Sequence, residues 1–219
     1  DIYYTLRYKA AYDHLIVECT ISNRGDDVFR PEYSRLFIGV DSEMKTYPDW
    51  DTKFFPTLLR CEKDFAWGYF MSPRQIIMGI GVEEPVASYT LNYVYEGSME
   101  WKWGHQIKTG SLDLLHCLPL PERHPQNNLS LKPHETRKWT LHLGVVDRLA
   151  GVKEKLSQWI QAPMIECEKY TMAGHETSRL LIHSQSGLEK LIVKAPDGTQ
   201  SVLPVDGVAD NVYSALFSP

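Results

Sequence analysis

Apolar residues recur at every second position through most of this 219-residue sequence, a pattern that few folds accommodate. Leu15, Val17, Cys19 and Ile21 fall on one face, while Glu18 and Thr20 fall on the other. Residues 137–146 repeat the pattern around Trp139. Successive side chains of a β-strand point to opposite faces, so each run predicts a strand with one buried face. The fold expected is therefore all-β, an antiparallel β-sandwich.

The expected strands follow from the same alternation and from the Pro and Gly residues that separate the runs. They cover residues 2–8, 15–21, 35–40, 57–61, 66–71, 75–82, 88–95, 112–118 and 137–146, then 165–172, 178–183, 188–194 and 201–203. A Pro-Asp-Gly turn at 195–200 joins the last two.

One segment has helical spacing instead. After Asp147 the apolar residues are three or four positions apart, and Pro163 ends the run. Asp147 is expected to be the N-cap, because a carboxylate accepts bonds from the first free N–H groups of a helix. The sequence thus predicts a sandwich over residues 1–146, a linker helix over 147–163 and a small Ig-like β-module, or part of one, over 164–219.

Composition excludes several classes of function. The net charge of −5 argues against a partner that is a nucleic acid. No apolar run approaches the ~20 residues that a membrane-spanning helix needs. The four cysteines lie far apart and form no CxxC pair, so they are interpreted mainly as buried free thiols, with a disulfide as the alternative.

Motifs for cofactors and metals are missing as well. His105, His116 and His124 form neither HxH nor HExxH, so no spacing fixes two of them on one face, and no metal site is predicted. Phosphate-cradling glycine loops and nucleophile elbows are also missing, so no cofactor is expected and the catalytic residues are unknown.

Tryptophans near turn signals are the candidates for sugar stacking. Trp50, Trp101 and Trp103 lie beside Asp, Lys and His residues, and flat aromatic faces pack well against sugar rings. The alternative is that aromatic residues at alternate strand positions fill the core.

A proline-rich connection between residues 119 and 128 holds several of the polar candidates. Long ordered loops often carry function, but they also cover sheet edges. The connection is interpreted as a structural corner that seals a contact with another domain. The polar residues to test are His105, Asp113, Glu122, Arg123 and His124.

Two stretches resemble a known group of domains. "LKPHETRKWTLHLGVV", with Leu131, Pro133, Glu135, Thr136 and Trp139, resembles the last strand of the N-terminal super-sandwich (galactose-mutarotase-like) domains of bacterial carbohydrate-active enzymes. Residues 58–93 resemble their middle strands. The resemblance covers about residues 1–160. It implies a six-hairpin helical catalytic domain elsewhere in the polypeptide, and no catalytic residue carries over to this chain.

Three functions remain open. The first is a non-catalytic accessory region of a glycan-processing enzyme, which packs on a catalytic domain missing from this chain and carries a large apolar patch for it. The second is a stand-alone carbohydrate-binding module whose partner is a glycan. The third is a mutarotase-like epimerase or lyase, which requires His and carboxylate groups converging on one sheet face. A glycan-degrading enzyme would favour a periplasmic or secreted location.

Overall fold

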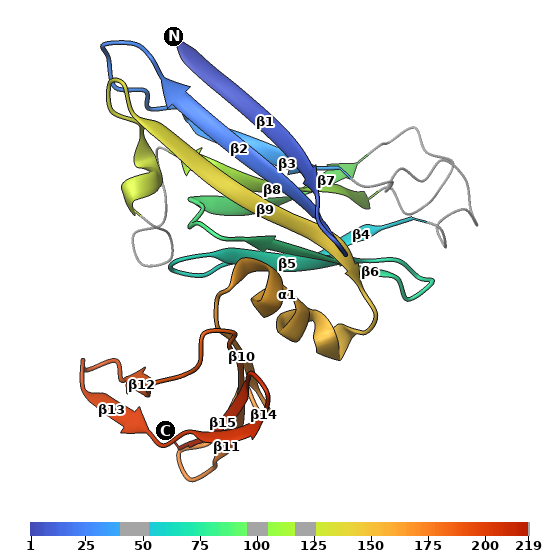
Figure 1. Cartoon of the computed structure of the whole chain (residues 1–219), viewed down its shortest axis with the longest axis vertical. Coiled ribbons are helices and arrows are strands. Elements are labelled where there is room, and N and C mark those ends of the chain that lie inside the picture. The colour runs from blue at the N-terminus through green and yellow to red at the C-terminus, as the bar shows by residue number, and fades with distance from the viewer. Residues whose placement is uncertain (40–52, 96–104, 117–125, 219) are drawn as a thin grey trace. The chain divides into compact units, whose positions relative to one another are not determined.

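The computed structural model describes residues 1–39, 53–95, 105–116 and 126–218. Strands dominate this part of the chain, which contains one short α-helix, so the predicted all-β fold with a helix is confirmed (Figure 1). The chain divides into two compact units, residues 1–152 and residues 153–219.

The larger sheet of the first unit is antiparallel and has six strands, in the order β1–β2–β9–β6–β5–β4. Its strands are β1 (Ile2–Ala10), β2 (Leu15–Asn23), β4 (Phe55–Cys61), β5 (Ala66–Met71), β6 (Ile77–Val82) and β9 (Thr136–Val146). Alternation sets its faces: Val17, Cys19 and Ile21 of β2 are buried, and the residues between them are partly exposed.

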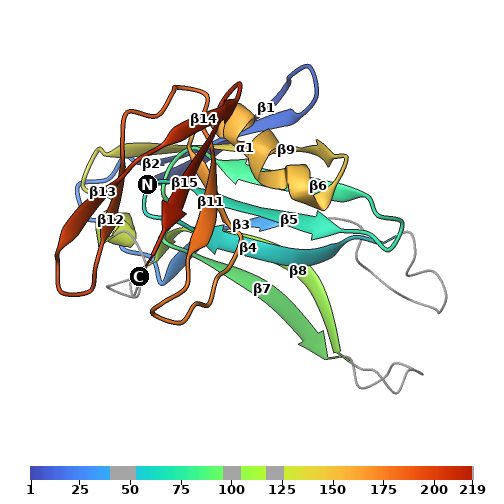
Figure 2. The same ribbon diagram turned by 90° about the horizontal axis from the view of Figure 1, so that it is seen from below.

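The smaller sheet of this unit has the order β3–β8–β7 and consists of β3 (Tyr33–Ile38), β7 (Ser88–Tyr95) and β8 (His105–His116). Figure 2 shows β7 and β8 running beside β4, which contacts both. A 3-10 turn, Gln126–Leu129, precedes β9.

The core lies between these two sheets, as in any sandwich. Ile21, Trp139 and Leu141 of the larger sheet share one buried cluster with Leu112 and Leu114 of β8. The Trp139 ring is fully buried, and its indole N–H donates to the carbonyl of Pro85 at 3.0 Å. This aromatic side chain therefore fills the interior, as the alternation predicts.

Strand β1 is the exposed edge of the larger sheet. It pairs only with β2 within the described residues, from Ile2–Asn23 to Ala10–Leu15. Tyr4, Leu6 and Tyr8 lie opposite the buried residues of β2, yet they are 57%, 43% and 65% exposed. The apolar face of β1 therefore extends beyond the cover that the smaller sheet provides.

A helix follows β9. Helix α1 (Val152–Ile160) buries Val152, Leu156 and Trp159, as the helical spacing predicts. The expected N-cap at Asp147 is wrong: the chain enters α1 through a 3-10 turn, Leu149–Gly151, whose capping position is Arg148 and makes no side-chain cap. No helix of the described residues has the length and apolar character needed to cross a membrane.

The second unit contains a four-stranded antiparallel sheet, in the order β10–β11–β15–β14, and a hairpin, β12–β13. The strands are β10 (Met164–Cys167), β11 (Ser178–His183), β12 (Leu191–Lys194), β13 (Gln200–Leu203), β14 (Asp206–Ala209) and β15 (Val212–Phe217). Leu180, Ile182 and Ala215 form its small core. The Ig-like assignment of residues 164–219 stays a prediction.

Three of the cysteines lie in the described residues, and all three are free thiols. Burial raises the pKa of Cys19 to about 11 and that of Cys61 to about 12. Protonated thiols are poor nucleophiles, so these two side chains are inert at neutral pH. Cys117 lies outside the described residues.

Candidate functional site

The larger sheet has a polar face across β1, β2 and β9, on the side away from the sandwich core. Alternation places every second residue of these strands there. We call this surface the polar face; its residues are Tyr3, Thr5, Arg7 and Lys9 of β1, Ile16, Glu18, Thr20 and Ser22 of β2, and Thr136, Lys138, Thr140 and His142 of β9.

Strand register fixes which of these residues are neighbours. Arg7 lies opposite Glu18, and Glu18 lies opposite Thr140 on the next strand. Opposed side chains of antiparallel strands are about 4.5–5.5 Å apart, and diagonal neighbours lie within reach of long side chains. Lys9 and Lys138 occupy the two diagonal positions around Glu18.

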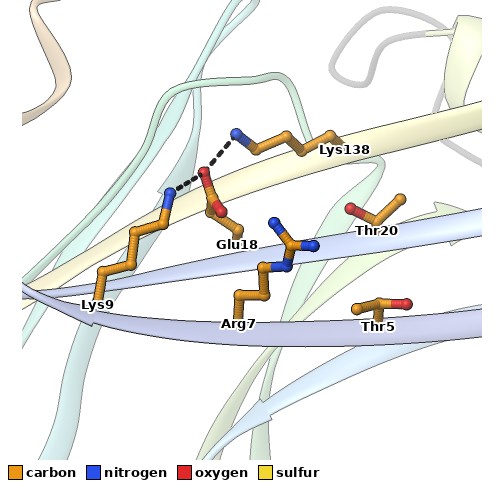
Figure 3. Close-up of a pocket in the computed structure, with 6 residues that line it drawn as sticks. All are labelled: Thr5, Arg7, Lys9, Glu18, Thr20 and Lys138. Carbon is orange, nitrogen blue, oxygen red and sulfur yellow. Dashed lines mark hydrogen bonds and ion pairs between the residues drawn. The ribbon is translucent and has the colours of Figure 1, made fainter.

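Both lysines bind the same carboxylate oxygen. Glu18 Oε1 accepts from Lys138 Nζ at 2.7 Å and from Lys9 Nζ at 2.9 Å (Figure 3). The bond from Lys138, followed by that from Lys9, lowers the pKa of Glu18 to about 2. The same bond raises the pKa of Lys138. At neutral pH the cluster therefore holds three cations, with Arg7, and one anion.

These charges line a pocket of about 400 Å³ on the polar face. Its walls are Thr5, Arg7, Lys9, Glu18, Thr20 and Lys138. We call it the cationic pocket. It combines an excess of positive charge with two threonine hydroxyls, which is the donor set suited to a hydrated or anionic ligand.

His142 of the polar face forms a hydrogen-bonded chain with His14 of the β1–β2 turn. His14 Nε2 lies 2.9 Å from His142 Nδ1. The outer nitrogens bind carboxylates: His14 Nδ1 lies 2.8 Å from Asp13 Oδ1, and His142 Nε2 lies 2.8 Å from Glu83 Oε1. The chain connects the β1–β2 turn, β9 and the end of β6, and the His142 side chain is 5% exposed.

Burial determines the titration of the inner histidine. The His142 ring is almost fully enclosed, and an enclosed imidazole is harder to charge than one in water. Burial therefore lowers the pKa of His142, and the hydrogen bond to Glu83 opposes that shift.

The lowered pKa assigned to His142 predicts a pH dependence of stability. The pKa of His142 is lower in the folded chain than the ordinary value of about 6.5 that applies to the unfolded chain. Below pH 6.5 the unfolded chain therefore binds more protons at this residue, and the free energy of unfolding falls as the pH decreases. In H142Q this part of the acid destabilisation should disappear. At neutral pH the variant should lose about 1–3 kcal/mol, the cost of leaving buried partners unsatisfied.

Denaturant unfolding at pH 7.5 and 5.5 measures both effects. H175Q is the matched control, because His175 is exposed and should leave the pH dependence unchanged. Equal pH dependence in wild type and H142Q would contradict the assignment.

Glu84 is hydrogen-bonded to Thr140 of the polar face. Its carboxylate accepts from the Thr140 backbone N–H at 2.6 Å and from the Thr140 hydroxyl at 3.1 Å. Burial raises the pKa of Glu84, and the two bonds from Thr140 oppose that rise. Both hydrogen bonds hold the Glu84 carboxylate against β9.

Of the residues singled out from the sequence, Asp113 is the one whose side chain the structure describes. It is 2% exposed and pairs with Arg35 of β3, whose Nε donates to Asp113 Oδ1 at 2.5 Å. The Arg35 guanidinium also lies 4.1 Å above the Tyr33 ring. This is a buried ion pair between strands, and it involves none of the other candidates.

The remaining candidates stay untested. His105 is the first residue of β8, but its side chain is not described. Trp50, Trp101, Trp103, Glu122, Arg123 and His124 lie outside the described residues. No group of three potential metal-ligating side chains occurs in the described ranges.

Sequence reasoning missed the groups that the fold does bring together. Arg7, Glu18 and Lys138 come from three strands. The histidine pair and its partners come from the β1–β2 turn, from β9 and from the residue after β6. The alternation shows that Glu18, Lys138 and His142 face away from the core. The contact of Glu18 with Lys138 depends on the pairing of β2 with β9, whose paired residues lie more than 100 positions apart in sequence.

The sequence matches no protein-family model, and it matches none of the curated proteins compared with it. One solved structure, a polysaccharide lyase, is similar to the entire chain, with a TM-score of 0.68 and 17% sequence identity. The alignment covers 100% of this chain and 30% of the lyase chain, so this chain spans less than a third of that protein's length. At this identity the likeness shows a shared fold.

Proposed function

We propose that this chain is a non-catalytic β-sandwich region of a glycan-processing enzyme and packs against a catalytic domain of the same polypeptide. The observation that carries the proposal is the likeness of the whole chain to part of a larger polysaccharide lyase. A sandwich that recurs as about a third of such an enzyme is suited to an accessory role. The resemblance to super-sandwich domains of carbohydrate-active enzymes supports the same role.

The apolar face of β1 supports the packing part of the proposal. Tyr4, Leu6 and Tyr8 expose large apolar surface along one edge strand. The Tyr4 hydroxyl accepts a hydrogen bond from the Ser34 hydroxyl of the smaller sheet at 3.1 Å. Contiguous exposed apolar surface marks interaction sites, and an uncovered edge strand is usually protected in native proteins. A partner domain would bury both.

The histidine pair supports the non-catalytic part. A general base needs a ring nitrogen that can reach substrate. All four ring nitrogens of His14 and His142 are already hydrogen-bonded within the chain. The convergence of histidines and carboxylates on one sheet face therefore serves to hold strands together.

Turnover assays test this proposal. The chain, incubated with neutral and acidic polysaccharides, should release neither new reducing ends nor the ultraviolet absorbance of unsaturated uronates. Sugar anomerisation should proceed at the spontaneous rate. Turnover that is lost in H142Q would overturn the proposal in favour of an epimerase or lyase built on the sandwich.

A triple variant tests the packing surface. Y4T/L6T/Y8T should change the free energy of unfolding by less than about 1.5 kcal/mol, because exposed positions each contribute about 0.5 kcal/mol or less. It should also reduce self-association, measured by light scattering. I21T is the matched control: Ile21 is buried on the same sheet face and its replacement should destabilise strongly. Unfolding of the triple variant would show that these side chains belong to the core.

A carbohydrate-binding module is the second candidate, and the cationic pocket favours it. Its residues are accessible, and their donors point out of the sheet (Figure 3).

A further inference from the structure

We infer that the cationic pocket binds the anionic groups, carboxylate or sulfate, of an acidic glycan that lies across β1, β2 and β9. The inference rests on the proposed function in one respect, namely that the ligand is a glycan. None of the candidate residues singled out from the sequence is among those that line the pocket.

Local charge is the first reason. Arg7, Lys9 and Lys138 surround a single carboxylate, so the pocket carries an excess of two positive charges within a chain whose net charge is −5. The net charge repels polyanions at long range. Binding of an anion therefore has to come from a specific cluster, and the described residues place such a cluster here.

Unused donors are the second reason. Lys9 and Lys138 each use one of three N–H groups on Glu18. Arg7 makes no ion pair or hydrogen bond with any side chain in the described ranges, although its guanidinium lies beside Glu18 in Figure 3. A guanidinium presents a planar fork of donors that fits carboxylate and sulfate oxygens bidentately. Arg7 is therefore the residue that would bind the anion through two hydrogen bonds.

The neighbouring groups point to a sugar chain. Thr5 and Thr20 place hydroxyls beside Arg7, which suits the hydroxyls of a sugar ring. None of the described residues that line the pocket is aromatic, so they offer no platform for stacking of a neutral sugar or of nucleic-acid bases. An acidic glycan supplies both the anion and the hydroxyls.

Glu18 gives the inference a directional test. Its carboxylate neutralises part of the pocket and occupies one N–H of each lysine. E18Q removes that charge while keeping the side-chain shape. The variant should therefore bind acidic glycans several-fold more tightly. R7Q should bind them about tenfold more weakly, as expected for the loss of a bidentate charged contact. Damage to the fold cannot produce opposite changes in two neighbours.

The experiment is a calorimetric titration of the full chain with matched polymers. Dextran sulfate is compared with dextran, and polygalacturonate with its methyl ester, so that each pair differs only in charge. R179Q is the matched variant, because Arg179 is exposed on β11 in the other unit and removes the same charge. Inorganic sulfate distinguishes a simple anion site from a glycan site. All variants are first checked for cooperative unfolding.

Binding to the charged polymers that weakens in R7Q, strengthens in E18Q and is unchanged in R179Q supports the inference. Equal losses in R7Q and R179Q would overturn it, because the attraction would then be non-specific. Equal affinity for charged and neutral polymers would overturn the anionic specificity and leave the glycan role standing. Tighter binding of a single-stranded oligonucleotide would reassign the pocket to nucleic acid. Absence of all binding would overturn the inference while the turnover result stands independently.

Discussion

R35M should lower the free energy of unfolding by about 3–5 kcal/mol, because removing one partner of a buried ion pair leaves the other charge without compensation. Asp113 is the partner at risk: its side chain is 2% exposed and its carboxylate depends on Arg35, which is itself 17% exposed. The methionine keeps most of the apolar stem of Arg35 and removes the guanidinium that lies over Tyr33. Denaturant unfolding with a constant m-value would measure the loss.

The double variant R35M/D113L provides the control. Apolar replacement of both partners is often neutral or stabilising, so most of the lost stability should return. A double variant as unstable as the sum of its parents would show that the two residues stabilise the fold through separate contacts.

W139A should cost about 3–5 kcal/mol, the usual price of removing a large aromatic side chain from a packed core. Trp139 is fully buried between the two sheets, and its indole N–H satisfies the carbonyl of Pro85. W139F should cost less, since it keeps most of the apolar volume and loses mainly the hydrogen bond.

Lys138 provides the neighbouring comparison for Trp139. It precedes Trp139 on the same strand and points to the opposite face, so K138A should change stability by about 1 kcal/mol or less, as is usual for exposed ion pairs. Thermal or denaturant unfolding measures all three variants. Similar losses in W139A and K138A would contradict the assignment of the two sheet faces.

The two faces of each sheet were the part of the fold that the sequence predicted best. Alternation around Val17 and Trp139 predicts which side chains enter the core, and both are buried. The helix is predicted by a change of spacing at Asp147, but its N-terminus is not, because the 3-10 turn before Val152 has no side-chain signature. Strand β14 was missed because none of its residues is buried, so it shows no alternation.

Sites formed between strands were much harder to predict from the sequence. Asp113 was one of the polar candidates from the sequence, but nothing in the sequence indicated its partner. Arg35 lies 78 residues away and reaches Asp113 through the pairing of β3 with β8. The cationic pocket depends on the pairing of β2 with both β1 and β9 in the same way. Sequence spacing carries little information about such registers.

The position of β1 has a consequence for the dynamics of the chain. This strand is held by β2 along one side, so its outward backbone amides should exchange with solvent deuterium sooner than those of β2 or β9. Arg7 and Lys9 lie on β1, whereas Glu18 and Lys138 lie on the two inner strands. A polymer bound across all three strands would hold β1 in place. Slower deuterium exchange of the amides of residues 2–10 would therefore show that the polymer is bound.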